Sequence, residues 1–108
     1  MRDSYERIYD LVKQIPIGKV STYGDISKSL GINNPRLVGY ALHNNPDPSS
    51  IPCHRVVNSK GMIAKSFAFG GDLKQMELLK SEGIQFKNGK VDLERYRIRF
   101  KDEDMLRL

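Results

Sequence analysis

The sequence predicts a single, mostly α-helical domain that carries a helix-turn-helix and one small β hairpin. Three observations predict it. Three segments before His43 space their apolar residues as helices do, a fourth such segment lies near residues 72–82, and two extended pieces flank Asn88-Gly89. With 108 residues, 39% of them hydrophobic and 29% charged, the chain has material for one modest core. We treat residues 1–108 as one domain, with a core at about 4–96 and a basic tail at about 95–108.

Capping residues mark the first two helices. Ser4 is the expected cap of the first helix, which the break at 16–19 ends. The apolar residues at helical spacing in this segment are Tyr5, Ile8, Leu11, Val12 and Ile15. Thr22 opens a second helix, in which Asp25 can help to cap the first turn and Gly31 marks the end.

The third helix decides what the helix-turn-helix could contact. Asn34-Pro35 pairs an N-cap with the proline favoured at the first helical position, so we expect a helix to about His43. Its only side chain suited to reading base edges is Arg36, which argues against a sequence-specific regulator. Gly39 and Ala41 permit close backbone approach. Either they let two helices pack, or they let this helix enter the minor groove.

The rest of the chain alternates short extended pieces with one helix. Residues 56–63 read as two extended pieces around a polar turn, and the helix at about 72–82 places Leu73, Met76 and Leu79 on one face. Asn88-Gly89 is typical of a hairpin turn. The tail at 95–101 alternates basic and apolar residues, which fits either an edge strand with a solvated basic face or contact with phosphates.

Composition narrows the partners and the compartment. The formal net charge of +5 favours a polyanionic partner. No apolar run is long enough to cross a membrane, and the N-terminus has no hydrophobic signal region, so we expect a cytoplasmic protein, or a nuclear one in a eukaryote. One cysteine and two histidines give no zinc-ligand spacing, so we expect no metal.

The only cysteine, Cys53, stands directly before His54. A thiol reacts as its thiolate, and a neighbouring base can take its proton. A lone cysteine is also commonly a small buried hydrophobe. The pair alone therefore leaves nucleophilic catalysis and core packing both open.

Further motifs accompany this pair in a fixed order along the chain. They are Ile15–Gly24, Arg36 followed by Leu37-Val38-Gly39, Asn45-Pro46, Pro52-Cys53-His54-Arg55-Val56-Val57, and Glu82-Gly83. From about Tyr5 to Gly83 the chain resembles the C-terminal, DNA-binding domain of O6-alkylguanine-DNA alkyltransferases, also called methylated-DNA-protein-cysteine methyltransferases. The resemblance implies a winged helix-turn-helix-like domain that enters the minor groove of double-stranded DNA and flips an O6-alkylguanine out of the stack. It also implies a DNA repair protein that acts as a monomer without a cofactor.

The resemblance also implies a role for each matching residue. Arg36 would fill the place that the flipped base leaves, and Tyr23 would push the 3′ phosphate and hydrogen-bond the base. Asn45 would be the hinge between the recognition helix and the active-site segment. Cys53 would accept the alkyl group, with His54 acting through water and held by Glu82. The other residues expected at the DNA or in the pocket are Gly39, Ala41, Pro52, Arg55, Val56, Ser66 and Phe67.

Two segments depart from the methyltransferase pattern. Residues 63–71 replace the usual Tyr-Ser-Gly-Gly-like stretch, and this loop and the ending at 92–96 are similar to alkyltransferase-like proteins. Those proteins bind O6-alkylguanine without removing the alkyl group, mark it for nucleotide excision repair proteins, and usually carry tryptophan or alanine at the position of Cys53. Two functions therefore compete, a methylated-DNA-cysteine S-methyltransferase that acts once and a lesion sensor. We favour the enzyme because Cys53, His54 and Glu82 occur together.

Overall fold

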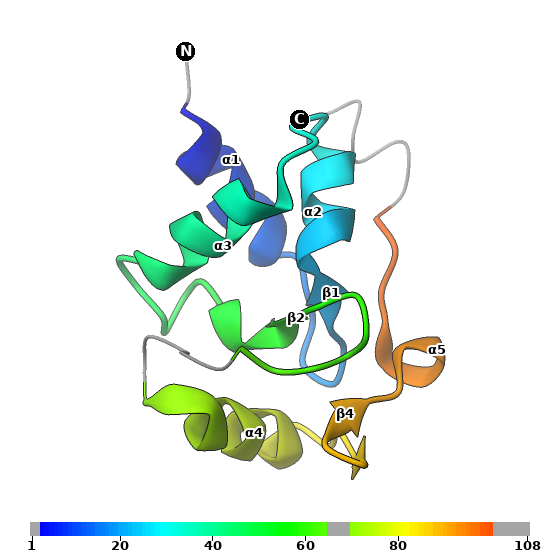
Figure 1. The fold of residues 1–108 in the computed structure, drawn as a ribbon. Coiled ribbons are helices and arrows are strands. Elements are labelled where there is room, and N and C mark those ends of the chain that lie inside the picture. The colour runs from blue at the N-terminus through cyan, green and yellow to red at the C-terminus, as the bar shows by residue number, and fades with distance from the viewer. Residues whose placement is uncertain (1–2, 65–69, 101–108) are drawn as a thin grey trace.

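The computed structural model describes residues 3–64 and 70–100 and confirms a mostly helical fold with small strands (Figure 1). Ser66, Phe67 and the tail from 101 onward lie outside the described residues. The elements in chain order are α1 (Ser4–Val12), β1 (Ser21–Thr22), α2 (Tyr23–Ser29), α3 (Pro35–His43), the 3-10 turn η1 (Cys53–Arg55), β2 (Val56–Val57), α4 (Gly71–Ser81), β3 (Phe86–Lys87), β4 (Lys90–Val91) and α5 (Leu93–Tyr96).

Local capping explains where the first three helices begin. The Thr22 hydroxyl accepts the Asp25 N–H at 3.1 Å and the Asn34 side chain accepts the Leu37 N–H at 3.2 Å, which confirms both predicted caps. The predicted cap of α1 is wrong by one residue. Asp3 caps α1 by accepting the Glu6 N–H at 2.8 Å, and Ser4 is already helical. Carboxylate and hydroxyl oxygens cap equally well, so neighbouring candidates compete.

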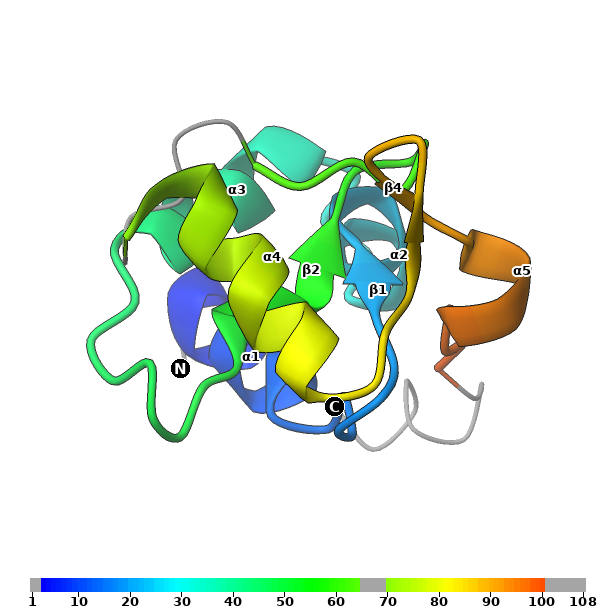
Figure 2. The same ribbon diagram turned by 90° about the horizontal axis from the view of Figure 1, so that it is seen from below.

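Two hydrophobic clusters lie on either side of a short parallel strand pair. One cluster is enclosed by α1, α2 and α3, which gather in the upper half of Figure 1, and the other lies among β2, α4 and the hairpin. Strand β1 pairs in parallel with β2, with Ser21 opposite Val56 and Thr22 opposite Val57. This pair joins the start of α2 to the end of η1, and Figure 2 shows it between α2 and α4.

The C-terminal third of the described chain packs a hairpin against the loop after β2. Strands β3 and β4 are antiparallel, and the positive φ angles of Asn88 (55°) and Gly89 (74°) confirm the predicted turn. The loop reaches the hairpin at Gly61, whose carbonyl accepts the Val91 N–H at 2.8 Å. A side chain at Gly61 would collide with the Val91 backbone, and the φ of 82° already favours glycine.

The predicted inward face of α4 is wrong in part. Leu79 is fully buried, but Leu73 is 70% exposed and the other buried side chain is Gln75. Gln75 hydrogen-bonds the backbone beside η1, and these bonds set the rotation of the helix.

The basic tail follows neither expected form completely. Val20 donates to the Tyr96 carbonyl at 2.9 Å and accepts from the Ile98 N–H at 2.8 Å, so the segment pairs alongside β1. The Arg97 side chain makes two hydrogen bonds to Asp25 and is only 27% exposed, so it is neither fully solvated nor free to bind phosphate. Within the described residues, no helix is long and apolar enough to span a membrane.

Candidate functional site

Cys53 begins η1 and is almost completely buried, with 5% of its surface exposed. Burial raises the pKa of the thiol above its ordinary value, because a thiolate there would lose its hydration. The Asn45 side chain and the backbone N–H groups of Cys53 and His54 act in the opposite direction by hydrogen-bonding the charged form. The site therefore holds a neutral thiol at rest, with donors already in place for the thiolate.

Asn45 links the end of α3 to the segment that carries Cys53. Its amide donates to the Ile51 carbonyl at 2.8 Å, and its side-chain oxygen accepts the Asp47 N–H at 2.9 Å. Only 5% of the residue is exposed. Both sides of the turn at 45–51 are thus tied to one side chain, an arrangement that suits the hinge position expected of Asn45.

His54, Arg55 and Glu82 form one cluster next to the thiol in sequence. The Nε2 atom of His54 lies 2.8 Å from Oε2 of Glu82, and Arg55 holds both carboxylate oxygens at 2.9 and 2.8 Å. Burial opposes ionisation of Glu82, but the hydrogen bonds from Arg55 and His54 outweigh it and hold the pKa of this carboxyl below its ordinary value. Arg55 also donates to the Ile15 carbonyl at 2.8 Å, so it fastens the cluster to the segment that follows α1.

Gln75 is a further member of this site that sequence reasoning missed. Its amide donates to the His54 and Val56 carbonyls at 3.1 Å each, and its side-chain oxygen accepts the Ala64 N–H at 2.9 Å. Only 1% of Gln75 is exposed. A single glutamine inside an amphipathic helix gives no signal in a sequence, because its partners lie on other segments.

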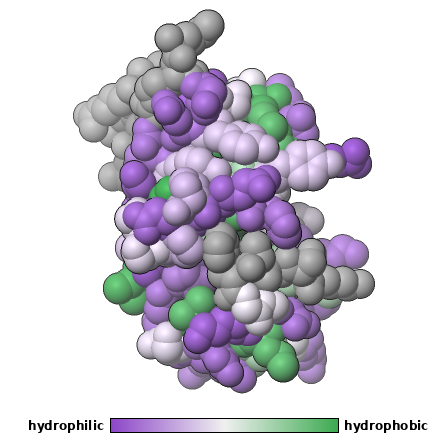
Figure 3. Space-filling view, turned by 90° about the vertical axis from the view of Figure 1, so that its left-hand side faces the viewer, coloured by the Kyte–Doolittle hydropathy of each residue, from purple (hydrophilic) through white to green (hydrophobic). Residues whose placement is uncertain are grey.

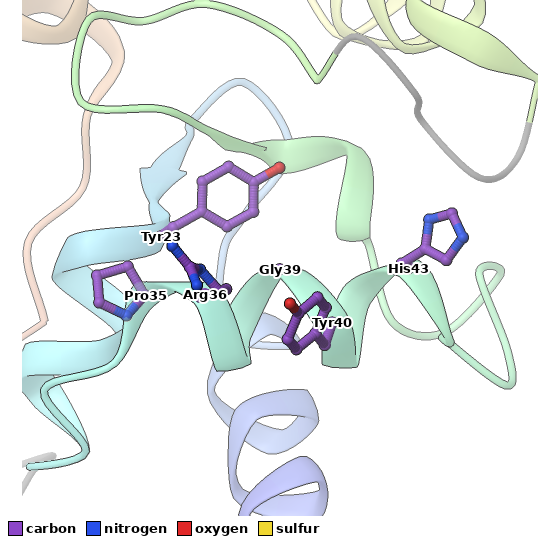
Figure 4. A pocket seen from close by; sticks show the side chains of 6 residues that line it. All are labelled: Tyr23, Pro35, Arg36, Gly39, Tyr40 and His43. Atoms are coloured by element: carbon purple, nitrogen blue, oxygen red, sulfur yellow. The ribbon is translucent and has the colours of Figure 1, made fainter.

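The second part of the candidate site is a hollow of about 590 Å³ on the outer face of α3 (Figure 4). Its lining residues are Tyr23, Pro35, Arg36, Gly39, Tyr40 and His43. Gly39 and Ala41 lie on different sides of α3. A Cβ added at Gly39 would meet nothing within 4 Å, so internal packing does not require glycine there. The Ala41 side chain is fully buried in the core, so its expected place at the DNA surface is wrong.

Tyr23 connects the hollow to the thiol. It is the first residue of α2, and its hydroxyl points away from α3 (Figure 4). Burial raises the pKa of Tyr23, and the nearby Cys53 sulfur raises it further. The predicted pocket residues Pro52 and Val56 are buried, and Val56 is a core residue with no exposed surface. We therefore correct the assignment of Val56 from the pocket to the core.

The surface around these elements is largely polar on the face that Figure 3 presents, with small separate hydrophobic areas.

Among residues 3–64 and 70–100, no three histidine, cysteine, aspartate or glutamate side chains gather in a way that could hold a metal ion.

Comparison with known proteins decides the family. Residues 3–84 match the family described as 6-O-methylguanine DNA methyltransferase, DNA binding domain. The chain belongs to this family. The span covers α1 to α3, Cys53 and the His54–Glu82 contact, so the resemblance noted from the motifs is confirmed.

Members of the 6-O-methylguanine DNA methyltransferase family with different names are similar to this chain. It is 40% identical to alkyltransferase-like protein 1 of Schizosaccharomyces pombe over 79% of this chain and 80% of that one. It is 44% identical to a DNA base-flipping protein of Vibrio parahaemolyticus, over 84% and 91%. It is also 44% identical to the methylated-DNA–protein-cysteine methyltransferase of Methanocaldococcus jannaschii, over 80% and 51%.

The lengths of these relatives differ. The chain spans 32% of the bifunctional methyltransferase/endonuclease of Picrophilus torridus, to which it is 42% identical over 88% of its own length. Among solved structures, S. pombe Atl1 in complex with damaged DNA containing O6-carboxymethylguanine is similar with a TM-score of 0.78 and 36% identity. That match covers 93% of this chain and 100% of that one. The Mycobacterium tuberculosis OGT in complex with DNA gives a TM-score of 0.69, with 30% identity over 77% and 50%.

Proposed function

We propose that this chain is a DNA repair protein that binds the minor groove of duplex DNA, extrudes an O6-alkylated guanine and transfers the alkyl group to Sγ of Cys53. The observation that carries the proposal is the contact of 2.8 Å between Glu82 and His54, the residue that follows Cys53 in the sequence. A nucleophile, a base and a group that orients the base are the parts that covalent catalysis by a thiol requires.

The DNA-binding half of the proposal rests on the outer face of α3. Arg36 lies on this face at the edge of the hollow and would take the place of the extruded base, while Tyr23 would contact the rotated phosphate. Gly39, which follows Arg36 by three residues, leaves the backbone of α3 bare at this face (Figure 4). The solved complexes of S. pombe Atl1 and M. tuberculosis OGT contain DNA, which supports the same use of this fold here.

The proposed reaction is a displacement at the alkyl carbon. The Sγ–C bond forms while the C–O6 bond breaks, and its electron pair goes to the guanine, which leaves as ordinary guanine after gaining a proton. His54 takes the thiol proton through a water and returns it to the leaving base. The thioether product has no easy return to thiolate, so each molecule acts once and needs no cofactor.

Glu82 orients His54 more than it activates it. Arg55 donates two hydrogen bonds to the same carboxylate and neutralises much of its charge. The contact with the carboxylate fixes the position of the imidazole ring. The buried, neutral thiol then loses its proton only when a substrate is in place.

Intact-mass measurement tests the proposal. The protein is incubated with a duplex that contains one O6-methylguanine, and we expect one added methyl group on the protein. Cys53→Ala should carry no methyl group yet still bind the duplex, since Cys53 lies in the core rather than on the DNA-facing hollow. Absence of the adduct from the wild-type protein contradicts transfer.

One observation favours a second function. Cys53 is 5% exposed and its pKa is raised by burial, which slows attack by sulfur. In this alternative the chain is a non-catalytic lesion sensor of the cytoplasm, or of the nucleus in a eukaryote, that holds the extruded O6-alkylguanine for nucleotide excision repair proteins. Tight binding that prefers the damaged duplex, together with an unmodified Cys53, is the result that selects the sensor.

A further inference from the structure

The outer face of α3 carries an aromatic side chain with no assigned role. Arg36, Gly39, Tyr40 and His43 follow the spacing i, i+3, i+4 and i+7, which places them on one side of the helix. All four line the hollow of about 590 Å³. Arg36 and Gly39 already have places in the proposed function, whereas Tyr40 has none.

Folding does not account for Tyr40. The residue is 56% exposed, and its hydroxyl makes no hydrogen bond to the described part of the chain. Only its backbone is used, because its carbonyl accepts the N–H and the side-chain amide of Asn44 at 3.1 and 2.9 Å. A change of the side chain beyond Cβ would therefore leave the helix and its C-terminal cap intact.

The surroundings of Tyr40 favour an anionic ligand of limited width. The hollow has a guanidinium from Arg36, phenols from Tyr23 and Tyr40, and no carboxylate among its lining residues. Figure 4 shows Arg36 and Tyr40 on neighbouring turns, with the bare backbone of Gly39 between them. A notch between a cation and a phenol suits a chain of sugars and phosphates, since the sugar can enter the notch and both side chains can hydrogen-bond phosphate oxygens.

We propose that Tyr40 is a DNA backbone contact, in which its ring packs on a deoxyribose and its hydroxyl donates a hydrogen bond to the neighbouring phosphate. The proposal rests on the proposed function, because it takes the outer face of α3 as the DNA-binding surface. Four residues of helix rise by about 6 Å, so Tyr40 meets a different nucleotide from Arg36. A backbone contact positions the protein without reading sequence or damage.

The test measures dissociation constants by fluorescence anisotropy for a duplex with one O6-methylguanine and for the same duplex undamaged. We expect Tyr40→Phe to weaken binding to both duplexes about threefold, as loss of one hydrogen bond does, and Tyr40→Ala to weaken both about tenfold. Leu73→Ala is the matched control, because Leu73 is 70% exposed on α4 and does not line the hollow. Its affinity should equal that of the wild-type protein.

The two duplexes separate this inference from the proposed function. Wild-type affinity of Tyr40→Ala for both duplexes would overturn the inference, even if the protein prefers damaged DNA. A loss confined to the damaged duplex would also overturn it, since the contact would then belong to the extruded base. If the wild-type protein shows no preference for damage while Tyr40→Ala still weakens both affinities, the lesion-directed function fails and the backbone contact stands.

Discussion

The guanidinium of Arg97 and the carboxylate of Asp25, 72 residues apart in the chain, form two hydrogen bonds of 2.7 Å each. Asp25 lies in the first turn of α2, two residues after Tyr23. The side chains are 27% and 17% exposed, so water screens the pair only in part. The pair ties the segment after α5 to the turn of α2 that presents Tyr23 to the hollow.

Arg97→Gln should lower the free energy of unfolding by about 1–2 kcal/mol at neutral pH, because Asp25 loses a charged partner. Hydrogen bonding from Arg97 holds the pKa of Asp25 below its ordinary value. A lowered carboxyl pKa stabilises the fold above the unfolded-state value of about 3.9, and this contribution disappears as pH falls through the folded-state pKa. Urea unfolding at several pH values should therefore show the difference between wild-type and Arg97→Gln shrinking in acid.

Arg95→Gln serves as the control for this pair. Arg95 is exposed, hydrogen-bonds Gln85 at 3.1 Å and lies over the Tyr96 ring at 5.1 Å, so its loss should lower stability by up to about 1 kcal/mol. Because neither partner is a carboxylate, this loss should not shrink in acid as the loss in Arg97→Gln does. A difference between wild-type and Arg97→Gln that stays constant down to strong acid would show that the Asp25 carboxylate is not the source of the stabilisation.

Cys53 should react slowly with iodoacetamide in the folded protein without DNA. Burial raises the pKa of its thiol above the ordinary value, so little thiolate is present near neutral pH. The labelling rate, followed by mass spectrometry, should rise only in alkaline solution. In urea the same thiol should label with a midpoint near pH 8.5, which is about the value for a free cysteine. A folded-state midpoint below the unfolded one would mean that the thiolate is formed before DNA binds.

Gly39→Ala should change stability and DNA affinity in opposite directions. Alanine is favoured over glycine inside a helix by up to about 1 kcal/mol, and the added Cβ meets nothing within 4 Å. Thermal unfolding should therefore occur at a higher temperature. Binding to duplex DNA should weaken, because the methyl group enters the notch between Arg36 and Tyr40. A variant that is stabilised and binds normally would remove Gly39 from the interface.

Structural features that depend only on neighbouring residues could be predicted from the sequence. The caps at Thr22 and Asn34 and the turn at Asn88-Gly89 depend on one or two side chains each, and the structure has all three. The motifs also identified the family, since Pro52 to Val57 and Glu82 fall within the matched span. The contact of His54 with Glu82 followed from the resemblance rather than from spacing.

Features that depend on distant partners could not be predicted. The Asp25–Arg97 pair and the bonds of Gln75 join segments whose proximity only the fold creates. The same reason explains why Ala41 was wrongly placed at the DNA surface. A small residue on a helix gives the same sequence pattern whether it faces the core or a ligand. Tyr9 on α1 donates to the Ala41 carbonyl at 2.7 Å, which helps to turn that part of α3 inward.

The parallel pairing of Ser21 with Val56 and of Thr22 with Val57 fixes the distance between two segments through main-chain hydrogen bonds alone. Strand β1 leads directly into Tyr23 of α2, and strand β2 directly follows the turn that begins at Cys53. The pairing therefore sets the separation of these two segments whatever side chain occupies position 53. The cysteine could therefore be exchanged during evolution without a change in the position of Tyr23 at the hollow on α3. A fold arranged in this way can keep its DNA-binding surface whether or not the residue at position 53 can accept an alkyl group.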